Sequence, residues 1–223
     1  DVNKGRMKRA DFAFIQGLVM KKYLLRDNIV VTGNPKYDEI KKEPLPNQPT
    51  IMINSNFTYG VFEDVRDQWV KDVVEICLEC GIEFFVSKHP RDKGVFPAEY
   101  NVMDSGAFLV NEQLKRSSIL VSRFSTLIYE ALCMGRKAIY YNPHNEPFRI
   151  FSEDQTGGIF IANDKSSLKQ IILDIIADPD QNDENVTNFL RNHCNMDKKS
   201  PKAVELIREE LLRIKATIPP KKG

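Results

Sequence analysis

Residues 117–141, SSILVSRFSTLIYEALCMGRKAIYY, alternate between two kinds of local structure. Residues 119–122 are a short apolar run that predicts a buried strand, and residues 126–134 carry apolar side chains at helical spacing as far as Gly135. Residues 138–141 are a second apolar run. A strand, a helix and a strand in succession predict one unit of a parallel sheet, because parallel strands need a crossover connection.

The same alternation continues on both sides of this unit. A strand over 50–54, a helix over 63–80 that stops at Gly81 and a strand over 82–86 come before it. A strand over 159–161 and a helix over 165–177, capped by Asp164, come after it. We therefore predict an α/β fold with a Rossmann-like, doubly wound parallel sheet. The other expected elements are a helix over 7–26, a strand over 29–32, a strand over 107–110, a short helix over 111–117 and an amphipathic helix over 201–215.

Residues 41–49 hold three prolines among charged and polar neighbours, which is the composition of a linker. We predict that residues 1–43 are the end of a preceding domain with its interdomain segment, and that 44–49 are the linker. Residues 50–216 would form the sheet domain with its C-terminal helix, and residues 217–223 a tail. The chain opens at Asp1 without a methionine, and we expect it to be part of a longer protein.

The composition argues against several classes of protein. Lys and Arg number 32 and Asp and Glu 31 in 223 residues, so the net charge of +1 lacks the basic footprint of a nucleic-acid binder. No apolar run approaches the ~20 residues of a membrane span. The four cysteines suit a reducing cytoplasm. Cys77 and Cys80 form a C-x-x-C inside an apolar helical pattern without a second ligand pair, so we expect no metal site there.

Polar side chains that could bind an anion follow three of the predicted strands. Because ligands of such sheets bind beyond the carboxyl ends of the strands, these loops are the candidate site. The candidate residues are Ser55, Asn56 and Thr58 after the first strand, Lys88, His89, Pro90 and Arg91 after the second, and Arg123, Ser125, Thr126 and Glu130 after the third.

The chemistry of these residues suits a nucleotide. Hydroxyls and helix N-termini can hold phosphate, and Lys88, Arg91 or Arg123 can neutralise its charge. His89 can donate a hydrogen bond to a phosphate or ribose oxygen, or act as an acid or base. The carboxylate of Glu130 could accept ribose hydroxyls. Each loop alone also fits an ordinary polar turn. Only the combination of the three loops predicts a binding site for a nucleotide monophosphate or diphosphate. The sequence contains neither G-x-G-x-x-G nor a P-loop motif, which argues against the usual dinucleotide-binding and P-loop sites.

At these residues the chain resembles the C-terminal domain of GT-B type glycosyltransferases. The resemblance is carried by SSILVSRFST (117–126) and EALCMGRKAI (130–139), which look like the family's strand, serine-threonine, helix and strand stretch. GNPKYD (33–38) looks like the segment that ends the N-terminal domain, and NSNF (54–57) like the first loop of bacterial surface-carbohydrate biosynthesis proteins. The resemblance spans residues 29 to 212 and implies one half of a GT-B fold.

The His89-Pro90 pair resembles an H-P pair of transferases that use CMP- or CDP-linked donors. These include bacterial sialyl- and polysialyltransferases, capsule Kdo transferases and CDP-glycerol glycerophosphotransferases. The resemblance implies that His89, Ser125 and Thr126 bind the donor's nucleotide phosphate, and that a sugar or glycerophosphate is transferred without a metal or further cofactor.

The resemblance also implies partners for this chain. A glycan or lipid-linked acceptor and the catalytic base would belong to the missing N-terminal half, so this chain would bind nucleotide without turnover and its catalytic residues stay unassigned. Peripheral association of such enzymes would place the protein in the cytoplasm at the inner face of the membrane.

Two other functions remain open. The UDP-N-acetylhexosamine 2-epimerases have a similar G-N-P line, here Gly33 to Pro35, but they carry S-G-G where this chain has RFST at 123–126. The other alternative is a GT-B-like domain that binds or scaffolds without catalysis.

Overall fold

The computed structural model describes residues 11–24, 27–58, 60–106, 109–197 and 200–217. The chain forms two compact units, one of residues 1–40 with 187–223 and the other of residues 41–186. Helix α7 (Asp183–Cys194) runs through the limit between them. The predicted domain limits, with a linker over 44–49 and one domain over 50–216, stay a prediction.

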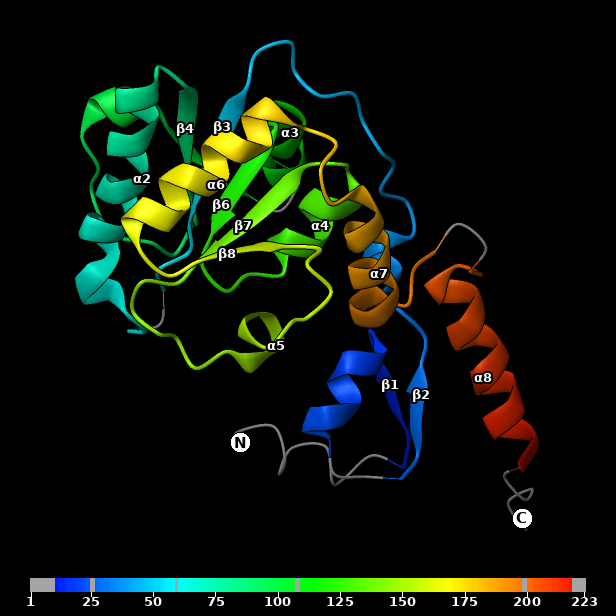
Figure 1. Ribbon diagram of the computed structural model, residues 1–223. Coiled ribbons are helices and arrows are strands. Elements are labelled where there is room, and N and C mark those ends of the chain that lie inside the picture. The colour runs from blue at the N-terminus through cyan, green and yellow to red at the C-terminus, as the bar shows by residue number, and fades with distance from the viewer. Residues whose placement is uncertain (1–10, 25–26, 59, 107–108, 198–199, 218–223) are drawn as a thin grey trace. The chain divides into compact units, whose positions relative to one another are not determined.

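The described part of residues 41–186 is built on a sheet of six parallel strands in the order β5-β4-β3-β6-β7-β8 (Figure 1). The chain adds β4 and β5 on one side of β3, and β6, β7 and β8 on the other. The predicted Rossmann-like α/β fold is therefore confirmed, and the winding changes direction between β3 and β6. The strands are β3 (Thr50–Ser55), β4 (Glu83–Lys88), β5 (Val102–Asp104), β6 (Ile119–Ser122), β7 (Lys137–Tyr141) and β8 (Phe160–Ala162).

Helices connect these strands, and their ends follow from local sequence. Gly81, at φ +65°, ends α2 because its backbone N–H reaches the carbonyls of Cys77 and Leu78. Asp164 and Ser167 form a capping box at the start of α6. The helices of this unit are η4 (Glu63–Val65), α2 (Arg66–Cys80), η5 (Ala98–Tyr100), α3 (Leu109–Lys115), α4 (Leu127–Cys133), α5 (Arg149–Ser152) and α6 (Lys165–Ala177).

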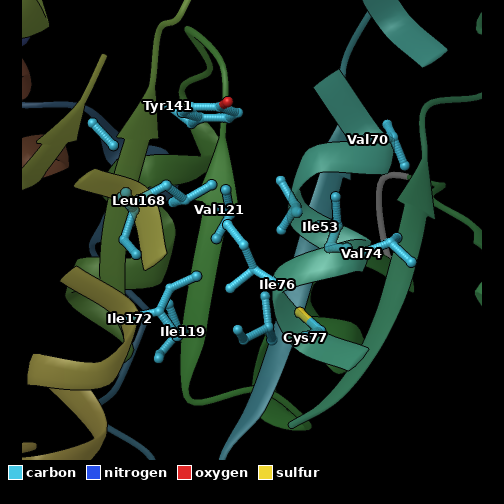
Figure 2. Packing of buried hydrophobic residues seen from close by; sticks show 14 of the residues in the cluster. Ile53, Val70, Val74, Ile76, Cys77, Ile119, Val121, Tyr141, Leu168 and Ile172 are labelled. Carbon is cyan, nitrogen blue, oxygen red and sulfur yellow. The ribbon is translucent and has the colours of Figure 1, made fainter. Parts of the chain in front are cut away.

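The main core lies between the sheet and the helices α2 and α6 (Figure 2). Alternate residues of a strand point to opposite faces. Ile51 and Ile53 of β3 therefore pack under α2, whereas Met52 faces the other side, where α4 contacts β6 and β7. The buried residues on the α2 and α6 side include Ile119, Val121, Ile139, Trp69, Val73, Ile76, Leu168 and Ile172.

The unit of residues 1–40 and 187–223 contains a two-stranded parallel sheet of β1 (Ala13–Ile15) and β2 (Ile29–Val31). Its other described elements are η2 (Leu18–Tyr23), η3 (Pro35–Tyr37) and α8 (Ala203–Thr217). Added to Gly17, a Cβ would lie 2.3 Å from the backbone of His193, so the chain can make this close approach only with glycine.

Two sequence predictions are wrong. The helix predicted over 7–26 is a strand at Ala13–Ile15 and a 3₁₀ helix at Leu18–Tyr23, because Ala13 to Ile15 pair with Ile29 to Val31. The strand predicted over 107–110 is helical at Leu109 and Val110, and the strand of that region is β5. Residues 7–10, 25–26 and 107–108 lie outside the described residues. The sequence pattern also does not predict α5 or α7.

None of the described helices is both long and apolar enough to cross a bilayer.

Candidate functional site

Three loops meet where β3, β4 and β6 end. Ser55 pairs with Lys88 on one side, and Asn54 pairs with Ser122 on the other. The side chains repeat this link, because Asn54 Nδ2 donates to Ser122 Oγ at 2.8 Å. The winding of the sheet changes direction at this place, and in open α/β sheets that is where ligands bind.

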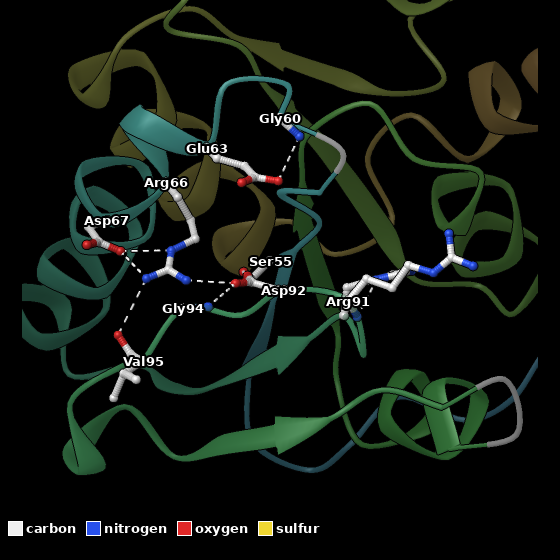
Figure 3. Close-up of polar contacts among 10 residues, drawn as sticks. Ser55, Gly60, Glu63, Arg66, Asp67, Arg91, Asp92, Gly94 and Val95 are labelled. Carbon is white, nitrogen blue, oxygen red and sulfur yellow. Dashed lines mark hydrogen bonds and ion pairs between the residues drawn. The ribbon is translucent and has the colours of Figure 1, made fainter.

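The loop after β4 is tied down by one carboxylate, that of Asp92 (Figure 3). Ser55 Oγ donates to Asp92 Oδ2 at 2.6 Å, and Arg66 Nη1 and the Gly94 backbone N–H donate to Oδ1 at 2.7 and 2.8 Å. Ser55 and the Asp92 side chain are both buried. The hydroxyl of Ser55, a predicted ligand contact, therefore supports the loop from inside.

His89 stands on that loop with a defined orientation. Its backbone N–H donates to Ser55 O at 3.2 Å, and the Arg91 backbone N–H donates to His89 Nδ1 at 3.1 Å. An Nδ1 that accepts carries no proton, so the neutral ring is protonated on Nε2. The half-buried imidazole therefore presents Nε2–H as a hydrogen-bond donor. Lys88 is half-buried, and Pro90 and Arg91 are exposed beside it.

The protonation of His89 gives a first prediction. Burial lowers the pKa of His89 below the ordinary value of 6.5, the charge of Arg91 lowers it further, and Asp92 opposes both effects. We expect the NMR titration midpoint of His89 to lie below 6.5 and to rise in Arg91→Ala, with His89→Gln to assign the signal. The imidazole of His89 therefore binds its proton more tightly in the unfolded chain than in the folded one. As the pH falls below about 6.5, this difference lowers the free energy of unfolding. A midpoint at or above 6.5 would contradict the environment described here.

The loop after β6 places Arg123 inside the protein. Arg123 Nε donates to Glu146 Oε1, and both side chains are buried. Arg123 Nη1 donates to the carbonyls of Asn56 at 3.1 Å and Val61 at 3.3 Å, and the guanidinium lies 4.2 Å from the ring centre of Phe57. Arg123, predicted from the sequence to contact phosphate, thus makes bonds that join three loops.

The remaining candidate residues divide by exposure. Asn56 is half-buried and its Nδ2 donates to Phe124 O at 3.2 Å, which ties the loop after β3 to the loop after β6. Ser125, one residue before the N-cap Thr126, accepts the Leu127 N–H at its Oγ, at 3.2 Å. Thr126 is exposed and its side chain makes no cap hydrogen bond. Thr58 and Glu130 are buried.

Sequence reasoning missed Arg66, Asp92 and Glu146. Asp92 stands two residues after Pro90, and its position after a strand could have drawn attention to it. Nothing local pairs it with Arg66, however, or Arg123 with Glu146, because these partners lie 26 and 23 residues apart.

An open hollow of about 810 Å³ lies at the other edge of the sheet. It is lined by Thr50 and Glu83, where β3 and β4 begin, and by Arg116. It is therefore separate from the candidate site. Among the residues that the structure describes, no cluster of three or more His, Cys, Asp or Glu side chains could hold a metal ion.

No protein-family model matches this chain, and a search of curated proteins finds no match. Solved structures do match. A structure of the wall teichoic acid polymerase TagF soaked with CDPG is 14% identical with a TM-score of 0.61, over 94% of this chain and 58% of TagF. A putative UDP-N-acetylglucosamine 2-epimerase from Listeria monocytogenes is 17% identical with a TM-score of 0.64, over 96% of this chain and 62% of that one.

A third structure is the Methanocaldococcus jannaschii UDP-GlcNAc 2-epimerase in complex with UDP-GlcNAc and UDP. It is 14% identical with a TM-score of 0.53, over 93% of this chain and 61% of that one. This chain thus spans less than two thirds of each protein's length. At such identities the likeness establishes the fold alone: the chain has the Rossmann-like α/β architecture of GT-B glycosyltransferases and of UDP-GlcNAc 2-epimerases.

Proposed function

We propose that this chain is the donor-binding half of a glycosyltransferase that takes a sugar or glycerophosphate from a CMP- or CDP-linked donor. The observation that carries the proposal is the His89 ring, held by Arg91 N–H so that Nε2–H is the donor at the edge where the sheet winding reverses. The soak of TagF, a structural neighbour, with CDPG supports a cytidine-linked donor.

The proposed chemistry needs little beyond hydrogen bonds and charge. As the bond to the transferred group breaks, negative charge grows on the departing nucleotide phosphate, and fixed donors there stabilise the transition state. His89 Nε2–H would donate to a phosphate oxygen, and Lys88 and Arg91 would neutralise the charge without a metal. Pro90 fixes the backbone beside His89.

Exposure divides the candidate residues into contacts and supports. Asn56, Ser125 and Thr126 reach the same edge and would supply further polar contacts. Glu130, predicted from the sequence to bind the ribose hydroxyls, is buried one turn into α4, so by the same criterion it belongs with the supporting residues. We assign the buried Ser55, Thr58 and Arg123 to support of the loops.

The acceptor and the catalytic base would come from the part of the transferase outside this chain. A glycan or lipid-linked acceptor of surface-polysaccharide synthesis, met at the cytoplasmic face of the membrane, fits the proposal. Nucleotide binding without turnover is then the behaviour expected of this chain alone.

Calorimetric titration with CMP, CDP, UMP and UDP tests the proposal. We expect the cytidine nucleotides to bind best, and His89→Ala to weaken them about 10- to 100-fold, since a hydrogen bond to a charged group contributes about 1.5–3 kcal/mol. His89→Gln, whose amide can also donate, should retain part of the affinity. Lys169→Ala, a change on α6 that removes an exposed cation paired with Glu79, is the control. Equal affinity of wild type and His89→Ala would sink the proposal.

A second candidate function is isomerisation of a UDP-linked N-acetylhexosamine. The match to the Listeria monocytogenes protein over 96% of this chain favours it. A preference for UDP in the titration, together with epimerised product from UDP-GlcNAc, would establish it in place of transfer. The absence of any nucleotide binding would instead favour a binding or scaffolding role.

A further inference from the structure

The buried carboxylate of Asp92 connects the loop that carries His89 to two other elements (Figure 3). One oxygen accepts Ser55 Oγ at the end of β3, and the other accepts Arg66 Nη1 from the first turn of α2. The side chain of Asp92 is 2% exposed. A charge so deep is tolerated only when it is paired and hydrogen-bonded, and here both oxygens have partners.

Asp92 also closes the turn on which His89 stands. The Asp92 backbone N–H donates to His89 O at 2.9 Å, and its Oδ1 accepts the Gly94 N–H at 2.8 Å. Between them Arg91 donates its backbone N–H to His89 Nδ1. The bond that fixes the tautomer of His89 therefore depends on a turn whose far end is held by Asp92.

Other contacts hold the guanidinium of Arg66 where it meets Asp92. Its Nε and Nη2 donate to Asp67 Oδ1, and its guanidinium lies 4.6 Å from the ring centre of Phe96. Added to Gly94, a Cβ would lie 0.8 Å from Arg66 Nη1, so any larger residue there would displace the guanidinium from this position. Arg66, Gly94 and Ser55 together donate three hydrogen bonds to the Asp92 carboxylate.

We propose that Asp92, held by Arg66 and Ser55, is the positioning residue of His89. Asp92 fixes the turn from His89 to Asp92, and in that turn the ring of His89 accepts the Arg91 N–H at Nδ1. The ring then offers Nε2–H to the nucleotide phosphate. This inference rests on the proposed function for its ligand, but the geometry of the ring can be tested without one. Asp92 does not contact the ligand and acts through His89.

A double-mutant cycle of CDP affinity tests this role, since residues that act through one another have non-additive effects. We expect Asp92→Ala to weaken CDP binding as much as His89→Ala does, about tenfold or more, and to have no further effect in the His89→Ala background. Asp92→Asn should stay within about threefold of wild type, because its amide can still accept from Gly94 and Arg66 and donate to Ser55 Oγ. Additive losses in the double variant would overturn the proposal.

A second measurement needs no nucleotide. The ¹⁵N spectra of the ligand-free chain report the protonation of each ring nitrogen, and the chain has only 3 histidines to assign. We expect an unprotonated, hydrogen-bonded Nδ1 at His89 in wild type and in Asp92→Asn, and loss of the Arg91 amide bond in Asp92→Ala. Ile175→Ala, which empties part of the core under α6, should lower the melting temperature without changing the His89 signals.

Unchanged His89 signals in Asp92→Ala would overturn the positioning role. If wild type binds no nucleotide, the proposed function fails, and the ring spectra still decide between the two outcomes for Asp92.

Discussion

Arg123→Met should lower the free energy of unfolding by about 3–5 kcal/mol, because it leaves the carboxylate of Glu146 buried without its cation. The side chains of Arg123 and Glu146 are 5% and 3% exposed. The variant also loses the bonds to the carbonyls of Asn56 and Val61. Urea denaturation followed by far-UV circular dichroism measures the change.

Two further variants separate charge from packing. Arg123→Met combined with Glu146→Leu should recover much of the loss, because replacing both partners of a buried ion pair by apolar groups is often close to neutral. Arg149→Met, at an exposed arginine paired at 3.6 Å with Glu153, should change the free energy of unfolding by about 0.5 kcal/mol or less. A loss below about 1 kcal/mol in Arg123→Met would mean that this guanidinium is available to a ligand after all.

Trp69→Ala should cost a similar amount, about 3–5 kcal/mol in the free energy of unfolding, as large aromatic truncations in cores do. Trp69 is 1% exposed and packs on Phe57 and Tyr141 with ring centres 5.6 and 5.5 Å apart. Its Nε1–H donates to Tyr141 O at 3.1 Å, so the variant also leaves a buried carbonyl without that donor. Since Trp69 is the only tryptophan, circular dichroism rather than fluorescence must follow the unfolding.

The control for this change lies on the same helix. Leu78 of α2 is 67% exposed, and Leu78→Ala should leave the free energy of unfolding within about 0.5 kcal/mol of wild type. Trp69→Phe, which keeps a ring but loses the N–H, should fall between the two. A small effect of Trp69→Ala would show that the core between α2 and the sheet is not packed as described.

The sheet could be predicted because its strands carry their own evidence. Ile51 to Ile53 and Ile119 to Val121 are buried on both faces, and such strands appear in the sequence as short continuous apolar runs. Gly81 and Asp164 mark helix ends through bonds to neighbouring backbone, and both were recognisable. Local chemistry of this kind needs no knowledge of distant partners.

The elements that were predicted wrongly from the sequence depend on distant partners. Residues 13–15 have a pattern that fits a helix, and only pairing with Ile29 to Val31 makes them a strand. β5 is only three residues long with none of them buried, and it is a strand through its pairing with Val86 to Lys88 of β4. Such pairings belong to the sheet as a whole, and a window of sequence does not contain them.

The candidate site was likewise predictable in part, where it depends on local sequence, and not where it depends on distant partners. The position of His89, Asn56 and Ser125 after strands follows from the sequence, because a parallel sheet sends all its carboxyl ends to one edge. Which of the polar side chains at that edge turn inward is a matter of long-range pairing. Arg123 meets Glu146, and Ser55 meets Asp92 with Arg66, because a buried charge or hydroxyl must find a partner wherever the fold brings one. The sequence thus specified the sheet and its polar edge, and the packing of the folded chain divided that edge into side chains that support the loops and side chains that face outward.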